Sequence, residues 1–382
     1  MRFYHPVPLL LLALLSLTLC GLPFLTWAAN RLVAGEPLLL WQITHGGWLL
    51  LPLVLLWLLA WSPPAPVNFL LMLLLAELLL AGMIFLSGEY AAALAAEGNR
   101  LARTAFGSGL WLSAALALLL AADAIRHLTP HPLWRLLLNG QIWLPPLLML
   151  LSGQLDQLSL LKEYANRQQI FDQAFFRHLA LLGGTLLPAL LIGVPLGIGL
   201  YRRPAWQSAT FGVLNVIQTV PSVALFGLLI APLAGLAQRF PALGHWGIGG
   251  IGVAPALIAL VLYALLPLVR SVVAGLQQVP AEVCETARGM GMGALQRFWH
   301  AEVPLALPVW LAGLRVVVVQ TLGMTVIAAL IGAGGFGAII FQGLLSSALD
   351  LVLLGVIPVI ALAVILDALF RLLISLLEVK NR

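Results

Sequence analysis

Long apolar runs separated by short polar segments dominate this sequence. A helix rises 1.5 Å per residue, so about 20 apolar residues cross the hydrocarbon core of a bilayer. Runs bounded by Pro, Gly, Asn and charged residues predict ten spans, near residues 7–27, 46–62, 67–87, 107–123, 136–153, 179–201, 208–230, 253–275, 305–328 and 351–377. Because lipid offers no partners to an open sheet edge, we expect an all-α integral membrane protein of about ten transmembrane helices.

Composition and charge agree with this fold class. The chain is 62% hydrophobic and only 9% charged, whereas soluble proteins carry roughly 25% charged residues. Its basic residues stand singly at the ends of apolar runs, a pattern typical of membrane orientation and not of a nucleic-acid surface. In the second half this bias predicts that both termini are cytoplasmic. The first apolar run is too long for a signal peptide and no small-residue cleavage site follows it, so we expect an uncleaved span.

The polar segment 154–178 divides the chain into two predicted domains. Residues 1–175 form an N-terminal membrane region of about five helices, and residues 176–382 form a second region of five. Five spans followed by five suggest an inverted repeat of the kind found in secondary transporters. No motif of the second half has a counterpart in the first, which argues against a repeat.

The most informative polar stretch is the loop 277–304, between two apolar spans. Pro280 suits a first helical turn, and Glu282 and Glu285 lie near the positive end of the helix that follows. Glycines at 289, 291 and 293 then permit a sharp bend. The loop is predicted to form two short helices that lie across the membrane face.

A second polar stretch interrupts the seventh predicted span. Polar groups inside an apolar helix need partners or a water-filled path. Helical spacing would place them on one face, and Pro221 frees a backbone carbonyl one turn earlier. The sequence leaves two roles open, a translocation path or hydrogen bonds between helices. The candidate path residues are Asn215, Gln218, Thr219, Pro221 and Ser222.

A third stretch, 331–337, reads IGAGGFG and matches the spacing G-x-G-x-x-G. A dinucleotide site needs a preceding strand, whereas a helix of membrane length comes first here. We expect the glycines to break the helix end into a compact turn inside the bundle, with a structural or gating role. These glycines are Gly332, Gly334, Gly335 and Gly337.

Several kinds of chemistry are missing from the sequence. Neither lysine, Lys162 or Lys380, follows a phosphate-binding loop, so we expect no ATP hydrolysis and no cofactor in this chain. No catalytic motif and no metal-ligand spacing is present, and Cys20 and Cys284 suggest no disulfide. Glu77 is an acid near the middle of a span, which indicates an ion path or a partner inside the bundle.

The loop 277–304 resembles the EAA loop of binding-protein-dependent ABC importer permeases, whose pattern is E-A-A, three residues, Gly, nine residues, I-x-L-P. Thr286 replaces the middle Ala and Ala301 replaces the Ile. This resemblance implies that the loop docks into a groove of a separate ATPase subunit, which binds the ATP. The implied coupling residues are Glu282, Glu285, Ala287, Gly291 and Pro304.

The order of the motifs over residues 176–377 is similar to that of osmoprotectant permeases, in which Q-T-x-P-S would line the path and I-G-A-G-G-L-G recurs. The first half resembles the extended Yeh-type glycine betaine uptake permeases. The resemblance implies a bacterial inner-membrane permease that translocates a quaternary-ammonium osmoprotectant such as glycine betaine. Its implied partners are an ABC ATPase, a second permease subunit and a periplasmic solute-binding protein. The rival functions are an ion-coupled secondary transporter and a membrane scaffold.

Overall fold

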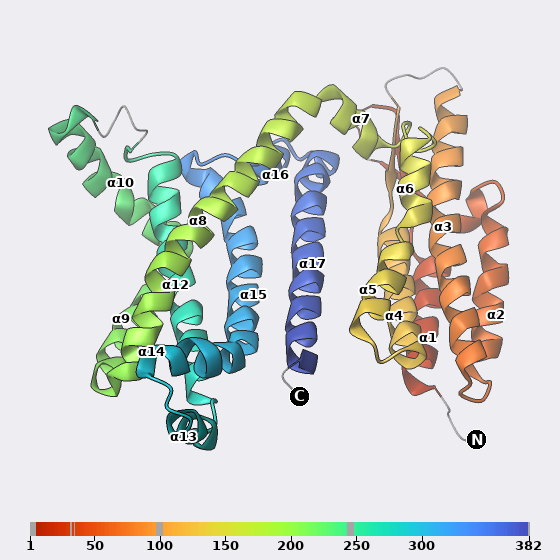
Figure 1. The fold of residues 1–382 in the computed structure, drawn as a ribbon. Helices are drawn as coiled ribbons and strands as arrows, with labels where there is room; N and C mark the ends of the chain where they lie inside the picture. Colours follow the sequence, from red (N-terminus) through yellow and green to blue (C-terminus); the bar gives the residue numbers. More distant parts are fainter. Residues whose placement is uncertain (1–4, 31–32, 34, 97–101, 243–247, 381–382) are drawn as a thin grey trace. The chain divides into compact units, whose positions relative to one another are not determined.

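The computed structural model describes residues 5–30, 33, 35–96, 102–242 and 248–380 (Figure 1). The chain folds into two compact units, Met1–Asn166 and Arg167–Arg382. Each unit has its own core and is described separately.

The N-terminal unit consists of helices with a small sheet. Its elements are α1 (Pro6–Gly21), β1 (Leu25–Ala28), β2 (Glu36–Leu38), η1 (Leu40–Gln42), η2 (Gly46–Leu49), α2 (Leu50–Ala60), α3 (Pro66–Ala96), β3 (Arg103–Phe106), α4 (Ser108–Leu128), α5 (Pro132–Gln141), α6 (Leu144–Leu151) and α7 (Ser159–Asn166). Its core is a layer of aliphatic side chains shared by α1, α2, α3 and α4, with Leu15, Leu56 and Leu79 completely buried.

The three-stranded antiparallel sheet, in the order β2-β1-β3, departs from the all-helical prediction. Trp27 pairs with Glu36 on one side and Thr104 on the other. Next to β3, the buried Glu163 of α7 forms an ion pair of 2.7 Å with Arg103. Burial, with Arg103 adding repulsion, lowers the pKa of the neighbouring Lys162. β1 takes up the last residues of the first predicted span, 7–27, because α1 ends at Gly21, whereas β2 and β3 lie between predicted spans.

The C-terminal unit is helical throughout its described residues. Its elements are α8 (Gln168–Arg202), η3 (Pro204–Trp206), α9 (Gln207–Thr219), α10 (Ser222–Arg239), α12 (Val253–Gln277), α13 (Ala281–Gly289), α14 (Ala294–Arg297), the π-helical turn η4 (Phe298–Glu302), α15 (Val303–Ala328), η5 (Ala329–Ile331), α16 (Phe336–Leu345) and α17 (Leu349–Lys380). Within this unit α13 lies at one end of the bundle, and α16 lies at the opposite end (Figure 1).

Helix α12 is the centre of the C-terminal unit and packs against both α8 and α15. Small residues allow these helices to approach closely, as is common for helices in membranes. A Cβ at Gly197 of α8 would lie 2.7 Å from Val272, and a Cβ at Gly313 of α15 would lie 2.1 Å from Ser271. Polar pairing adds a link between α15 and α17, where Arg315 bonds to Asp367.

The predicted spans are partly corrected. Over the described residues, seven helices are long and apolar enough to cross a membrane. Three shorter apolar helices are also present, at Pro6–Gly21, Gly46–Ala60 and Phe336–Leu345. The first predicted span ends early, at Gly21, and the chain then enters β1. The fifth is divided into α5 and α6, and α6 begins with Pro145 and Pro146 in its first turn. The seventh is divided at Val220, which is extended before Pro221.

Candidate functional site

Residues 277–304, here called the corner loop, join the central helix α12 to α15 at one end of the C-terminal unit. Pro280 is the N-cap of α13, with φ −60° and ψ 135°. Glu282 lies in the first turn of α13, where a carboxylate interacts favourably with the helix dipole. The Thr286 hydroxyl donates to the Glu282 carbonyl at 2.8 Å, so the hydrogen bond of this side chain stays inside α13.

The bend after α13 is made at Gly291, which has φ 81°. Its amide donates to the Arg288 carbonyl at 2.9 Å, and the Met292 amide donates to the Ala287 carbonyl at 3.1 Å. This pattern satisfies the last carbonyls of α13 with a left-handed residue, as glycine allows at helix ends. The chain therefore changes direction within the four residues that separate α13 from α14.

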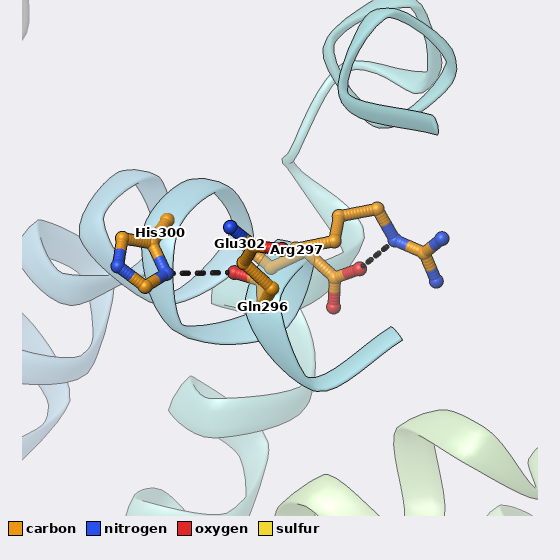
Figure 2. A network of polar contacts seen from close by, with 4 residues as sticks. All are labelled: Gln296, Arg297, His300 and Glu302. Carbon is orange, nitrogen blue, oxygen red and sulfur yellow. Dashed lines mark hydrogen bonds and ion pairs between the residues drawn. The ribbon is translucent and has the colours of Figure 1, made fainter. Parts of the chain in front are cut away.

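An ion pair links the end of α14 to the end of η4 in the second half of the corner loop. Arg297 Nε donates to Glu302 Oε1 at 2.9 Å, and both side chains are largely buried. Figure 2 shows that this bond spans the π-helical turn, while His300 on the same turn faces the Gln296 carbonyl at 3.0 Å. A charge-assisted bond of this kind fixes the angle at which the loop enters α15.

A cavity of about 700 Å³ opens between the end of α8 and the corner loop. Its walls are mostly polar and include Glu285 and Arg288 from α13, Arg297 and Glu302 from the ion pair, and Arg202 from α8. Arg202 lies 5.3 Å from the ring centre of Phe298, a cation–π distance. On the outer surface the large apolar side chains of Met290, Leu295 and Trp299 are exposed. Exposed Met and Trp side chains are enriched at protein interfaces, so this surface is suited to contact with another protein.

The structure brings four of the five predicted coupling residues together on or beside α13. Glu282 and Glu285 are exposed, Ala287 is buried against the loop, and Gly291 makes the bend. Pro304 is separate, in the first turn of α15. Sequence reasoning missed Arg202, whose place beside the cavity depends on how α8 packs against the corner loop. It also missed the pair of Arg297 and Glu302, whose five-residue spacing fits the π-helical turn and not a regular α-helix. The role of the five predicted residues in coupling stays a prediction.

The predicted path segment does not form one helix, which corrects the single polar face expected there. Asn215, Gln218 and Thr219 belong to α9, Pro221 is the N-cap of α10, and Ser222 is its first residue. The Thr219 hydroxyl bonds within α9, to the Val216 carbonyl at 2.7 Å.

Instead, this segment is fastened to α12. Gln218 donates to the Tyr263 carbonyl at 2.9 Å, and the Tyr263 hydroxyl donates to the Val220 carbonyl that the break exposes. Arg270 donates to the Asn215 amide oxygen at 2.8 Å. These bonds match the hydrogen-bonding role that the sequence had left open for Asn215 and Gln218. Sequence spacing gave no sign of Tyr263 and Arg270, which come from a different helix.

The glycine stretch forms a tight turn between η5 and α16. Gly332, Gly334 and Gly335 all have φ between 78° and 83°, a region that only glycine enters readily. Gly337 lies against α15, where a Cβ would approach the Val326 carbonyl to 2.0 Å. The predicted compact turn is therefore present, and its gating role stays a prediction.

Two residues of α8 hold this turn. Arg177 Nε donates to the Ala333 carbonyl at 2.9 Å. His178 is completely buried, with its ring 5.4 Å from that of Phe336 and a Cβ at Gly335 only 3.2 Å away. Both residues lie in the polar stretch that the sequence assigned to a domain boundary.

Over the described residues, no group of three or more His, Cys, Asp or Glu side chains could hold a metal ion.

Comparison with known proteins matches both units. Residues 189–378 match the family model described as binding-protein-dependent transport system inner membrane component, and residues 5–161 match one described as ABC transporter permease YehY, N-terminal domain. Osmoprotectant import permease protein OsmW of Salmonella typhimurium is 40% identical over 50% of this chain and 84% of its own length. Carnitine transport permease protein OpuCB of Listeria monocytogenes is 36% identical over 50% and 81%. The Bacillus subtilis glycine betaine/carnitine/choline permease OpuCB is 33% identical over 47% and 75%.

Proposed function

The chain belongs to the inner membrane components of binding-protein-dependent transport systems, and from this membership we propose that it imports a trimethylammonium osmoprotectant such as glycine betaine. Membership makes it a multi-pass permease subunit of an ABC importer of the bacterial inner membrane. The proposed substrate class is supported by the names of three relatives, since glycine betaine, carnitine and choline share a trimethylammonium group.

The observation that supports an ATP-driven role is the corner loop. It presents two short helices, a charged cavity of about 700 Å³ and exposed apolar side chains at one end of the bundle. The chain itself has no phosphate-binding loop. We propose that a separate ATPase subunit docks on α13 and α14, with Glu285 and Arg288 in the contact, and supplies the energy for transport.

The proposed assembly has further members. A second permease subunit, either a copy of this chain or a relative, would complete the path across the membrane. A periplasmic binding protein would deliver the substrate at the end of the bundle where α16 lies. In this arrangement the corner loop and both termini are cytoplasmic, as the arginine bias in the sequence predicts.

Uptake of labelled glycine betaine tests this proposal. Cells that lack other osmoprotectant importers should accumulate it when this permease is expressed with its ATPase and its binding protein. Deleting the ATPase alone should abolish uptake. Uptake that survives this deletion would indicate an ion-coupled transporter, and equal accumulation with and without the permease would remove the substrate assignment.

A further inference from the structure

A groove on the N-terminal unit has no role in the function proposed above. It has a volume of about 440 Å³ and runs between α3 and the segment formed by η2 and the start of α2. One half is lined by aliphatic side chains, including Leu51, Pro52 and Leu78. The other half contains Trp48, Phe85 and Glu89. The groove is therefore apolar at one end and carries aromatic rings and an acid at the other.

The groove follows one face of α3 toward the middle of the bilayer. Leu78, Gly82, Phe85 and Glu89 are spaced by three or four residues, so they lie above one another on the helix. The distance from Leu78 to Glu89 along the axis is about 16 Å at 1.5 Å per residue. Helix α3 has 31 residues, and its length of roughly 46 Å exceeds the hydrocarbon core of about 30 Å. Its apolar run ends near residue 87, so Glu89 lies just beyond the predicted span, close to the depth of the lipid headgroups.

The rim of the groove carries an exposed acid. Glu89 is exposed, and among the described residues no hydrogen bond or ion pair reaches its carboxylate. Trp48 is 77% exposed and Phe85 is 43% exposed, so both rings are accessible. The His45 ring packs edge-on against Trp48 with centroids 5.9 Å apart. A carboxylate beside accessible aromatic faces attracts an organic cation, and in a setting of low dielectric constant this attraction is strengthened.

We propose that this groove binds one phospholipid whose headgroup carries an ammonium group. The ammonium group lies between Glu89 and Trp48, and one acyl chain occupies the aliphatic half beside Leu78. A small free cation would occupy the rim alone and leave the aliphatic half uncovered. The length and the two-part chemistry of the groove therefore favour a lipid over a soluble quaternary ammonium compound.

Lipid retention by the purified full-length protein tests this proposal. The protein is equilibrated with equal amounts of phosphatidylethanolamine and phosphatidylglycerol in mild detergent, and bound lipid is measured by native mass spectrometry. Wild type should retain phosphatidylethanolamine selectively. Glu89→Gln should reduce this retention about tenfold, since a charge-assisted contact is lost. Leu78→Trp, which fills the aliphatic half and leaves the charge, should reduce it as well.

Glu36→Gln is the matched control, because Glu36 is an exposed acid of β2 that does not line the groove. It should retain phosphatidylethanolamine as wild type does. The proposal is overturned if both lipids are retained equally, or if Glu89→Gln behaves like the control. It is also overturned if choline binds, is lost in Glu89→Gln and is unaffected by Leu78→Trp, since that pattern identifies a site for a free cation.

Discussion

The ion pair between Arg297 and Glu302 links the two ends of the π-helical turn in the corner loop. Both side chains are largely buried, so removing one partner leaves a charge without compensation. We expect Glu302→Ala to lower the free energy of unfolding by about 1.5–3 kcal/mol, the range for hydrogen bonds to charged groups. The thermal unfolding midpoint of the purified permease in mild detergent measures this effect.

The neighbouring residue His300 offers a control on the same turn. The residue is exposed, and its ring forms a hydrogen bond of 3.0 Å with the backbone carbonyl of Gln296, one turn earlier (Figure 2). His300→Ala should therefore leave the midpoint nearly unchanged. Replacing both partners, with Arg297→Met and Glu302→Gln together, should recover much of the loss, because no unpaired charge then remains. Equal midpoints for Glu302→Ala and His300→Ala would contradict the role given to the ion pair.

At the scale of single residues, the sequence predicted where the backbone bends better than it predicted which side chains form hydrogen bonds with each other. Glycines at 291, 332 and 334 were expected to allow turns, and each has a positive φ. Their effect is local and does not depend on distant packing. The partner of Asn215 could not be predicted, because Arg270 and Asn215 are 55 residues apart. Hydrogen bonds between helices depend on rotation and depth, which a single sequence does not specify.

Among the elements, long apolar helices were predicted well and broken ones were not. Helix α12 begins at Val253, where its predicted span begins. The seventh span was expected as one helix, yet the chain is extended at Val220 before Pro221. Hydrophobicity is the same on both sides of this break, so the apolar pattern alone does not reveal it. The proline signal was present, but prolines such as Pro188 and Pro267 lie inside continuous helices.

The bend between α13 and α14 gives a prediction at this scale. Gly291 and Gly293 both have open space where the Cβ of an alanine would lie, but only Gly291 has a positive φ, at 81°. Gly291→Ala should therefore destabilise the bend by roughly 1–2 kcal/mol, the cost of a left-handed conformation for an L-residue. Gly293→Ala should be tolerated. Copurification with the ATPase subunit is the measurement.

Each variant adds one methyl group, and neither methyl group would have an atom from beyond its chain neighbours within 4 Å. Steric crowding therefore cannot explain a difference between the two variants. We expect Gly291→Ala to reduce retention of the ATPase while the permease stays in the membrane at normal abundance, because the glycine lies outside the helices of membrane length that flank it. Equal retention for both variants would show that the bend tolerates an L-residue. The corner loop would then not need this geometry for docking.

For the molecule as a whole, arginines are shared unevenly between the two ends of the C-terminal unit. Arg202 ends α8 and Arg203 follows it, and Arg288 and Arg297 belong to the corner loop, so these four lie on the side of α13. On the other side, Arg177 contacts the glycine turn and Arg239 ends α10. Basic residues collect in short loops on the cytoplasmic side. The chain passes from Gln169 at the start of α8 to Arg288 through α8, the broken pair α9 and α10, and α12. Three crossings place these two residues on opposite sides of the membrane.

Thiol labelling of introduced cysteines tests this orientation in intact spheroplasts. Cys284 lines the cavity of the corner loop and is half-buried, and Cys20 is half-buried in α1. Both are first replaced by Ser so that only the new thiol reacts. An impermeant reagent should then label Gln169→Cys and leave Arg288→Cys unlabelled until the membrane is opened, since both positions are exposed. Labelling of position 288 in sealed spheroplasts would place the corner loop outside the cell, where no ATPase could dock on it, and would exclude the coupling mechanism proposed for this permease.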